Sequence, residues 1–435
     1  MADVARRAIE FAKQKGASGS EVEVSAAVGQ SVTVRRGEVE TVEYNRDKGL
    51  GITVYFGQRR GNASTSDLAP DAVERTVEAA CAIARHTAED AATGLPDADR
   101  LYRGTPPDLE LFHPWGLDVE EAIEIARRCE AAALAVDRRI TNSEGATVSS
   151  YDSDFILANS LGFLDGFPNS KSSIGCGVVA EEKGAMQRDY WYTANRNPAR
   201  LEGAEAVGRV AGERAVRRLG ARKLATAEAP VIFEASLAGS LVSHFVAAAS
   251  GSSLYRQSSF LMDRLGTQVF SPVMRIVEDP HMPGELASGF YDAEGVATQR
   301  RTVVDAGMLN GWFLSSYSGR KLGLTTTGNA GGNHNLLIDS GTDDFAALLR
   351  RMGKGLVVTD LMGQGVNPVT GDYSRGAAGF WVEGGEIRFP VEEITIAGNL
   401  LDMFKGIVAV GNDVLVRGSK HTGSILVDRM TVAGD

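Results

Sequence analysis

Cysteine is scarce in this chain: its 435 residues include only three, Cys81, Cys129 and Cys176. An odd, widely spaced set does not suit the disulfide framework of a small secreted domain. No cysteine follows Cys176, so the C-terminal half offers no thiolate to a metal. Cys81 and Cys129 fall on apolar helical stripes, which predicts packed rather than reactive thiols.

Long apolar runs are also absent. No stretch approaches the ~18 consecutive apolar residues of a membrane-spanning helix. The first residues predict an amphipathic helix rather than the apolar segment of a secretion signal. The formal net charge is −11, and an acidic surface repels the phosphates of nucleic acids. We therefore expect a soluble, cytoplasmic protein that binds neither membranes nor nucleic acid.

Histidine is nearly as rare, and its six copies are far apart: His86, His113, His244, His281, His334 and His421. Zinc peptidase sites commonly place two histidines on one helix face and add a third ligand. No two of these histidines lie within one helical turn. His244 flanks the apolar stripe of a helix predicted over 237–250. The chain is therefore predicted to be unable to assemble a zinc-peptidase site of its own.

Glycine, by contrast, is abundant, with 50 residues, and its positions mark turns between short periodic segments. The order of these segments predicts an α+β protein, with N-terminal helix/antiparallel-sheet domains followed by a β-rich C-terminal domain. We place the three domains at 1–105, 106–223 and 224–435. Near the N-terminus, alternating polar and apolar residues predict an antiparallel meander of four short strands, over 21–28, 31–36, 39–44 and 51–56.

One serine pattern invites a catalytic interpretation. Ser318 and Lys321 have the S-x-x-K spacing in which a lysine accepts the serine proton from one helical turn away. Gly319 and Gly323 argue against a helix there, and no S-D-N element follows. An independent serine hydrolase is therefore an alternative rather than the main interpretation.

Polar side chains concentrate in loops of the third predicted domain. Hydrogen-bonding residues gather there in four short stretches: Tyr255 and Arg256, Arg320 and Lys321, Asn333 and His334, and Asp372, Tyr373 and Arg375. Such residues either anchor loops or line a binding cleft. We predict that they contact a peptide or a partner protein.

Several long motifs in this region resemble the TldE (PmbA) branch of the TldD/PmbA family of zinc peptidases. They lie at 252–260, 316–323, 328–334, 355–365, 370–381 and 393–399. In that family the TldD subunit holds zinc through an H-E-x-x-x-H helix and a cysteine near the C-terminus. The corresponding positions here are His244, Phe245 and Ala249, and 419–424 contains no cysteine.

The resemblance implies a metal-free partner subunit that carries no cofactor, with zinc expected in a TldD-like partner. It implies a complex that degrades or processes unfolded peptides, and an old family label is modulator of DNA gyrase. A homodimer is possible when the partner is absent. Two alternatives stay open: an independent hydrolase, using Ser318 and Lys321 or a metal site shared across a homodimer, and a non-enzymatic peptide-binding scaffold.

Overall fold

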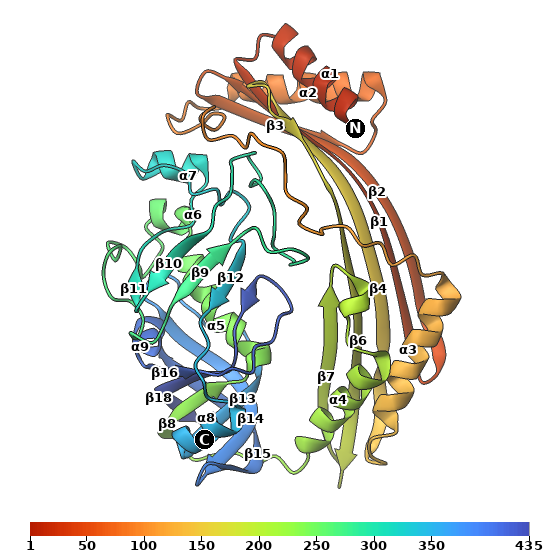
Figure 1. The fold of residues 1–435 in the computed structure, drawn as a ribbon, viewed down its shortest axis with the longest axis vertical. Coiled ribbons are helices and arrows are strands. Elements are labelled where there is room, and N and C mark those ends of the chain that lie inside the picture. The colour runs from red at the N-terminus through yellow and green to blue at the C-terminus, as the bar shows by residue number, and fades with distance from the viewer. Residues whose placement is uncertain (435) are drawn as a thin grey trace.

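A long, curved antiparallel sheet forms one side of the molecule, and a β-rich region stands opposite it (Figure 1). The computed structural model describes residues 1–434. The sheet has the strand order β3-β2-β1-β4-β6-β7, with β5 paired to β4. Its strands are β1 Gly19–Arg35, β2 Glu38–Phe56, β3 Arg59–Thr65, β4 Ile140–Asn159, β5 Leu164–Asp165, β6 Pro168–Glu182 and β7 Ala185–Asn195.

The predicted meander of four short strands is wrong. The segments 21–28 and 31–35 belong to one strand, β1, and 39–44 and 51–56 belong to β2, while Arg36 lies in the turn between them. Gly29 lies within the ladder, where it is opposite Asn45 on one side and Tyr151 on the other. A glycine between two paired strands keeps an extended conformation, because both neighbours satisfy its backbone groups.

The strands of the first two predicted domains join in this one sheet, because β1 pairs directly with β4. The boundaries at 105 and 223 stay predictions. Two helix pairs cover the outer face of the sheet: α1 Ala2–Gln14 with α2 Pro70–His86, and α3 Val119–Leu134 with α4 Ala204–Arg217.

Side-chain alternation along β1 separates the two faces of the sheet. Val22 and Val24 pack with the first helix pair, and Val32 and Val34 pack with the second. The opposite, inner face of the sheet is polar. Its hydroxyls pair across strands, Ser31 with Ser149 at 3.0 Å and Thr33 with Thr147 at 2.9 Å. Cys81 and Cys129 are buried among apolar side chains, which confirms their predicted packing.

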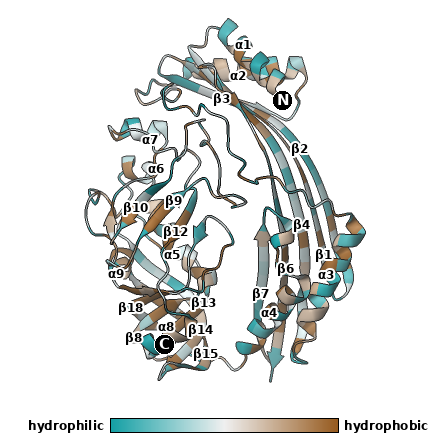
Figure 2. Cartoon of the chain, in the orientation of Figure 1, coloured by the Kyte–Doolittle hydropathy of each residue, from teal (hydrophilic) through white to brown (hydrophobic). Residues whose placement is uncertain are grey.

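The C-terminal region is β-rich, as predicted, and Figure 2 shows hydrophobic colouring in strands of both its sheets. The six-stranded sheet contains β8 Ala227–Phe233, β13 Lys354–Met362, β14 Asp372–Glu383, β15 Glu386–Asn399, β16 Ile407–Val410 and β18 Ile425–Ala433. The five-stranded sheet contains β9 Ile276–Asp279, β10 Arg301–Asp305, β11 Met308–Leu309, β12 Asn335–Ile338 and β17 Lys420–His421.

Short helices connect these strands: α5 Ala235–Ala248, α6 Gly251–Tyr255, α7 Ser316–Lys321, α8 Phe345–Met352 and α9 Leu400–Lys405, while a 3₁₀ turn at Pro198–Arg200 precedes α4. The expectation of no helix around Ser318 is wrong. Ser315 caps α7 by accepting a hydrogen bond from the Ser318 amide, and this cap offsets the weak helix propensity of Gly319. Within residues 1–434, no helix combines the length and apolar character needed to cross a bilayer.

Candidate functional site

His244 projects from α5 toward β14. Its ring packs edge-on against Tyr373, with the ring centroids 5.8 Å apart. Its buried Nε2 atom has no hydrogen-bond partner among the described residues. Burial, and secondarily the nearby Arg375 guanidinium, lower the pKa of His244. The imidazole is therefore neutral near pH 7, which is the form that binds metals or donates one hydrogen bond.

The surroundings of His244 do not fit a zinc ion. Phe245 is fully buried and packs against the rings of Phe270, Phe313 and Phe404. Ala249 is fully buried and has no donor atom. Zinc needs three or four converging donors, and a single imidazole does not hold it. Within residues 1–434, His, Cys, Asp and Glu nowhere gather in threes around a possible metal position.

The C-terminal segment 419–424 supplies no replacement ligand beside His244. His421 lies in β17, with its Nε2 atom 3.5 Å from a Glu285 carboxylate oxygen. The Ser424 hydroxyl donates to Asp413 at 2.6 Å and accepts from the Ala235 amide. The Ser424 contacts join the start of α5 to the segment before β18, which is a structural role.

Ser318 and Lys321 do not form a catalytic pair. The Ser318 hydroxyl is buried and accepts the Ser315 amide at 2.9 Å as part of the α7 cap. Lys321 forms an ion pair with Asp90 at 2.8 Å, and that hydrogen bond raises the pKa of Lys321. A lysine held as an ammonium ion cannot accept the serine proton.

Arg320 and Lys321 instead join α7 to the loop that follows α2. The Arg320 guanidinium donates to the Leu95 carbonyl at 2.6 Å and to Asp97 at 3.0 Å. Asp90 accepts the Tyr317 hydroxyl at 2.7 Å and pairs with Lys321. We call these six residues the α7 clamp. It connects the C-terminal region to the top of the curved sheet (Figure 1).

We expect Asp90→Ala to loosen the α7 clamp and destabilise the protein by about 1–2 kcal/mol, because it removes one part-exposed ion pair and the hydrogen bonds from Tyr317 and the Ala92 amide. Hydrogen exchange should accelerate in 87–97. Glu89→Ala is the control, since its partner Arg59 lies outside the clamp. Equal exchange in both variants would contradict the assignment.

The α7 clamp should also weaken in acid. Hydrogen bonds from Lys321, the Ala92 amide and Tyr317 lower the pKa of Asp90 from 3.8 to about 2. Because the folded-state pKa is depressed, the contribution is complete above pH ~4 and disappears as pH falls through about 2. The difference in free energy of unfolding between wild type and Asp90→Ala should therefore shrink as the pH falls from about 4 to about 2. Denaturant unfolding at each pH measures it.

The other predicted residues lie in separate groups. Asn333 accepts from Lys420 at 3.2 Å, and the His334 amide donates to buried Glu278 at 2.8 Å. Tyr255 packs edge-on against Tyr317, and its hydroxyl accepts from Arg256 at 3.2 Å.

Near His244, Arg375 donates to the Gly363 carbonyl at 3.0 Å, while Asp372 accepts the Thr370 hydroxyl at 2.6 Å. Tyr373 is buried. Binding of a peptide or partner by these residues stays a prediction.

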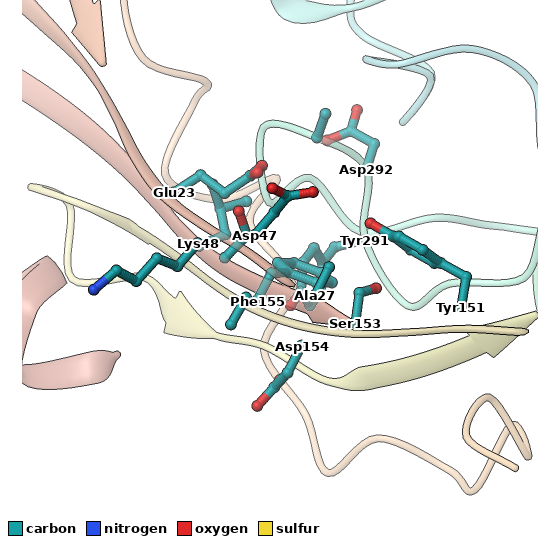
Figure 3. Close-up of a pocket in the computed structure, with 15 residues that line it drawn as sticks. Glu23, Ala27, Asp47, Lys48, Tyr151, Ser153, Asp154, Phe155, Tyr291 and Asp292 are labelled. Atoms are coloured by element: carbon teal, nitrogen blue, oxygen red, sulfur yellow. The ribbon is translucent and has the colours of Figure 1, made fainter. Parts of the chain in front are cut away.

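A cavity that sequence reasoning missed lies between the inner face of the sheet and the loop 291–293. It has a volume of about 520 Å³, and Figure 3 shows Glu23, Asp47 and Asp292 around it. Asp292 is buried, which raises the pKa of its carboxyl to about 7 against three backbone amides that lower it. The strand residues could be found from alternation alone, but their proximity to a loop more than 130 positions away could not.

Comparisons with known proteins identify a family to which the sequence and fold are similar. Profiles described as PmbA/TldA metallopeptidase domain 1, central domain and C-terminal domain match residues 20–84, 112–219 and 226–434. The Metalloprotease PmbA of Escherichia coli O157:H7 is 50% identical, over 98% of this chain and 94% of that protein. A Metalloprotease TldD homolog of Haemophilus influenzae is 23% identical, over 88% of this chain and 83% of that protein.

Two solved structures share the fold. A putative modulator of DNA gyrase from Bacteroides thetaiotaomicron superimposes with a TM-score of 0.95 at 27% identity, covering 100% of this chain and 98% of that one. TldE from Thermococcus kodakarensis superimposes with a TM-score of 0.86 at 20% identity, covering 99% of this chain and 100% of that one. At that identity the second likeness concerns the fold alone.

Proposed function

Because the chain belongs to the PmbA/TldD metallopeptidase family, we propose that it is the metal-free, TldE-like partner subunit of a heteromeric peptidase. The zinc and the water-activating glutamate are then supplied by a TldD-like chain. The complex degrades or processes unfolded peptides, and this subunit does not cleave them by itself.

The observation that carries the proposal is the position after His244. A zinc peptidase needs a carboxylate there to activate water, and this chain has Phe245 packed inside an aromatic core. Its side chain points into the protein interior. The packing of α5 therefore excludes a carboxylate at this position, and a single substitution would not supply a catalytic one.

The shape of the molecule supports a role in enclosing peptides. The curved sheet turns a polar inner face toward the C-terminal region, and the acidic cavity at Asp292 lies between them (Figures 1 and 3). Extended chains suit such a space, because their backbone can pair with strand edges. Among the predicted contacts, Arg256 and Arg375 retain donor groups for a peptide or partner, whereas Arg320 and Lys321 are engaged in the α7 clamp.

We expect no cleavage of an unstructured reporter peptide by this chain alone, purified from a host without a TldD-like protein. Adding a TldD-like chain with an intact H-E-x-x-x-H helix should produce cleavage, and a zinc chelator should abolish it. The TldD-like chain alone is the reference, and co-elution of the two chains tests the assembly.

Each alternative gives a distinct result in this experiment. Cleavage by the chain alone that survives chelation and disappears in Ser318→Ala would establish a serine hydrolase and overturn the proposal. Cleavage by the chain alone that a chelator stops would establish a metal site shared between copies. Peptide binding without co-elution or activation would favour a non-enzymatic scaffold.

A further inference from the structure

A second cavity opens on the outer face of the curved sheet. The helix pairs cover the rows around Val22 and Val24 and around Val32 and Val34, and they leave the middle of β1 uncovered. Ala26 and Val28 form the floor of this cavity, and its volume is about 740 Å³. We call it the outer trough. It lies on the opposite face from the cavity at Asp292.

Strand register gives the outer trough an ordered charge pattern. Lys48 and Asp154 both pair with Ala26, from the two sides of β1. Arg46 and Asp152 both pair with Val28 in the same way. The β2 row is thus basic, the β1 row apolar and the β4 row acidic. Figure 3 shows Lys48 and Asp154 leaving the sheet on the side away from Asp292.

The charges lining the outer trough are held apart. The two charged rows are two strand spacings apart, or about 10 Å, because β1 lies between them. Among the described residues, the side chains of these four charged residues, Arg46, Lys48, Asp152 and Asp154, form no ion pair or hydrogen bond. Asp152 is partly buried, and this desolvation raises the pKa of its carboxyl.

The far wall of the outer trough is apolar. Pro168 of β6 pairs opposite Asp154. Phe112, in the segment between α2 and α3, also lines this wall, with 43% of its surface exposed. At one end, Gln30 donates to the Asp118 carbonyl at the start of α3. The floor is an inner strand with neighbours on both sides, so a ligand is recognised by side chains rather than by adding a strand.

We propose that the outer trough binds short peptides through both of their free termini. The carboxylate pairs with Arg46 and Lys48, the ammonium pairs with Asp152 and Asp154, and an apolar side chain lies over Val28 against Phe112. At ~3.3–3.6 Å per residue, an extended tripeptide places its termini about 10 Å apart. A single amino acid is too short to reach both charged rows. This inference does not depend on the proposed subunit role, because the trough belongs to this chain alone.

The test is calorimetric titration of the full chain with the tripeptide Ala-Leu-Ala. N-acetylation and C-amidation should each weaken binding about tenfold, the amount expected for one charge-assisted contact. Substituting both cations, Arg46→Gln with Lys48→Gln, should abolish the effect of amidation and keep that of acetylation. Substituting both acids, Asp152→Asn with Asp154→Asn, should do the reverse.

The controls separate this site from general charge effects. Glu43→Gln alters an exposed acid on the opposite face of β2 and should bind like wild type. Free leucine should bind far more weakly than the tripeptide. The proposal is overturned if free and doubly blocked tripeptides bind equally, if neither binds, or if both paired variants respond to the two blocking groups as wild type does. Since cleavage is not measured, these outcomes leave the proposed peptidase role untouched.

Discussion

Replacing Arg301 with methionine should destabilise the protein by about 3–5 kcal/mol, because it leaves a buried carboxylate without its counter-charge. The Arg301 guanidinium lies 2.7 Å from Glu278, which is only 1% exposed. It also donates to the Trp312 carbonyl at 2.8 Å and to Asn329 at 3.0 Å. One side chain therefore joins β10, β9 and the glycine-rich loop 328–334.

The neighbouring residue provides a matched control for Arg301. Arg300 pairs with Asp279 at 3.0 Å, but its side chain is 59% exposed. Arg300→Met should therefore change the free energy of unfolding by at most about 1 kcal/mol. Urea denaturation of both variants measures the contrast. Equal losses would show that the Glu278 network is no stronger than a surface ion pair.

A double variant separates the loss of the Arg301–Glu278 attraction from the cost of leaving the Glu278 carboxylate buried and unpaired. Glu278→Leu with Arg301→Met removes both charges, so it should recover part of the stability that Arg301→Met loses. Recovery should be incomplete, because Asn329 and the His334 amide also donate to Glu278 and would lose their acceptor. A double variant that is less stable than Arg301→Met would contradict this explanation.

The sequence predicted element types better than element lengths. Alternation located the strand residues of β1 and β2, but Gly29 and the glycines near position 50 were interpreted as turns. In the sequence, a glycine inside a long ladder looks the same as a glycine in a turn, and the presence of a neighbouring strand decides between the two. Here β4 supplies that neighbour from more than 100 positions away, which local patterns cannot reveal.

In the candidate site too, some features could be predicted from the sequence and others depend on long-range contacts. Ligand chemistry depends on residue identity, so the lack of donors at Phe245 and Ala249 could be deduced without a structure. The role of Arg320 could not, because its partners at Leu95 and Asp97 lie more than 220 positions away. The outer trough depends on register as well. Lys48 and Asp154 acquire a relationship only through their common neighbour Ala26.

Restoring the glutamate of the zinc motif, by Phe245→Glu, should prevent folding rather than create a metal site. Phe245 is fully buried, and its ring centroid lies 5.0 Å from that of Phe270 and 6.2 Å from that of Phe313. Truncating such a phenylalanine to alanine costs about 3–5 kcal/mol. A glutamate adds the desolvation of a charge or forces its protonation, so the total loss is comparable with the whole stability of a typical domain.

The measurement is denaturant unfolding of Phe245→Glu, Phe245→Ala and Leu265→Ala, with bound zinc determined for each. Leu265 is 45% exposed and should lose less than about 1 kcal/mol on truncation. We expect Phe245→Ala to fold with reduced stability and without zinc, and Phe245→Glu to be unfolded, even with Ala249→His added. A folded Phe245→Glu, Ala249→His variant that binds one zinc ion would contradict this. It would mean that α5 can turn this position out of the aromatic core, and that the core does not prevent this chain from holding a metal.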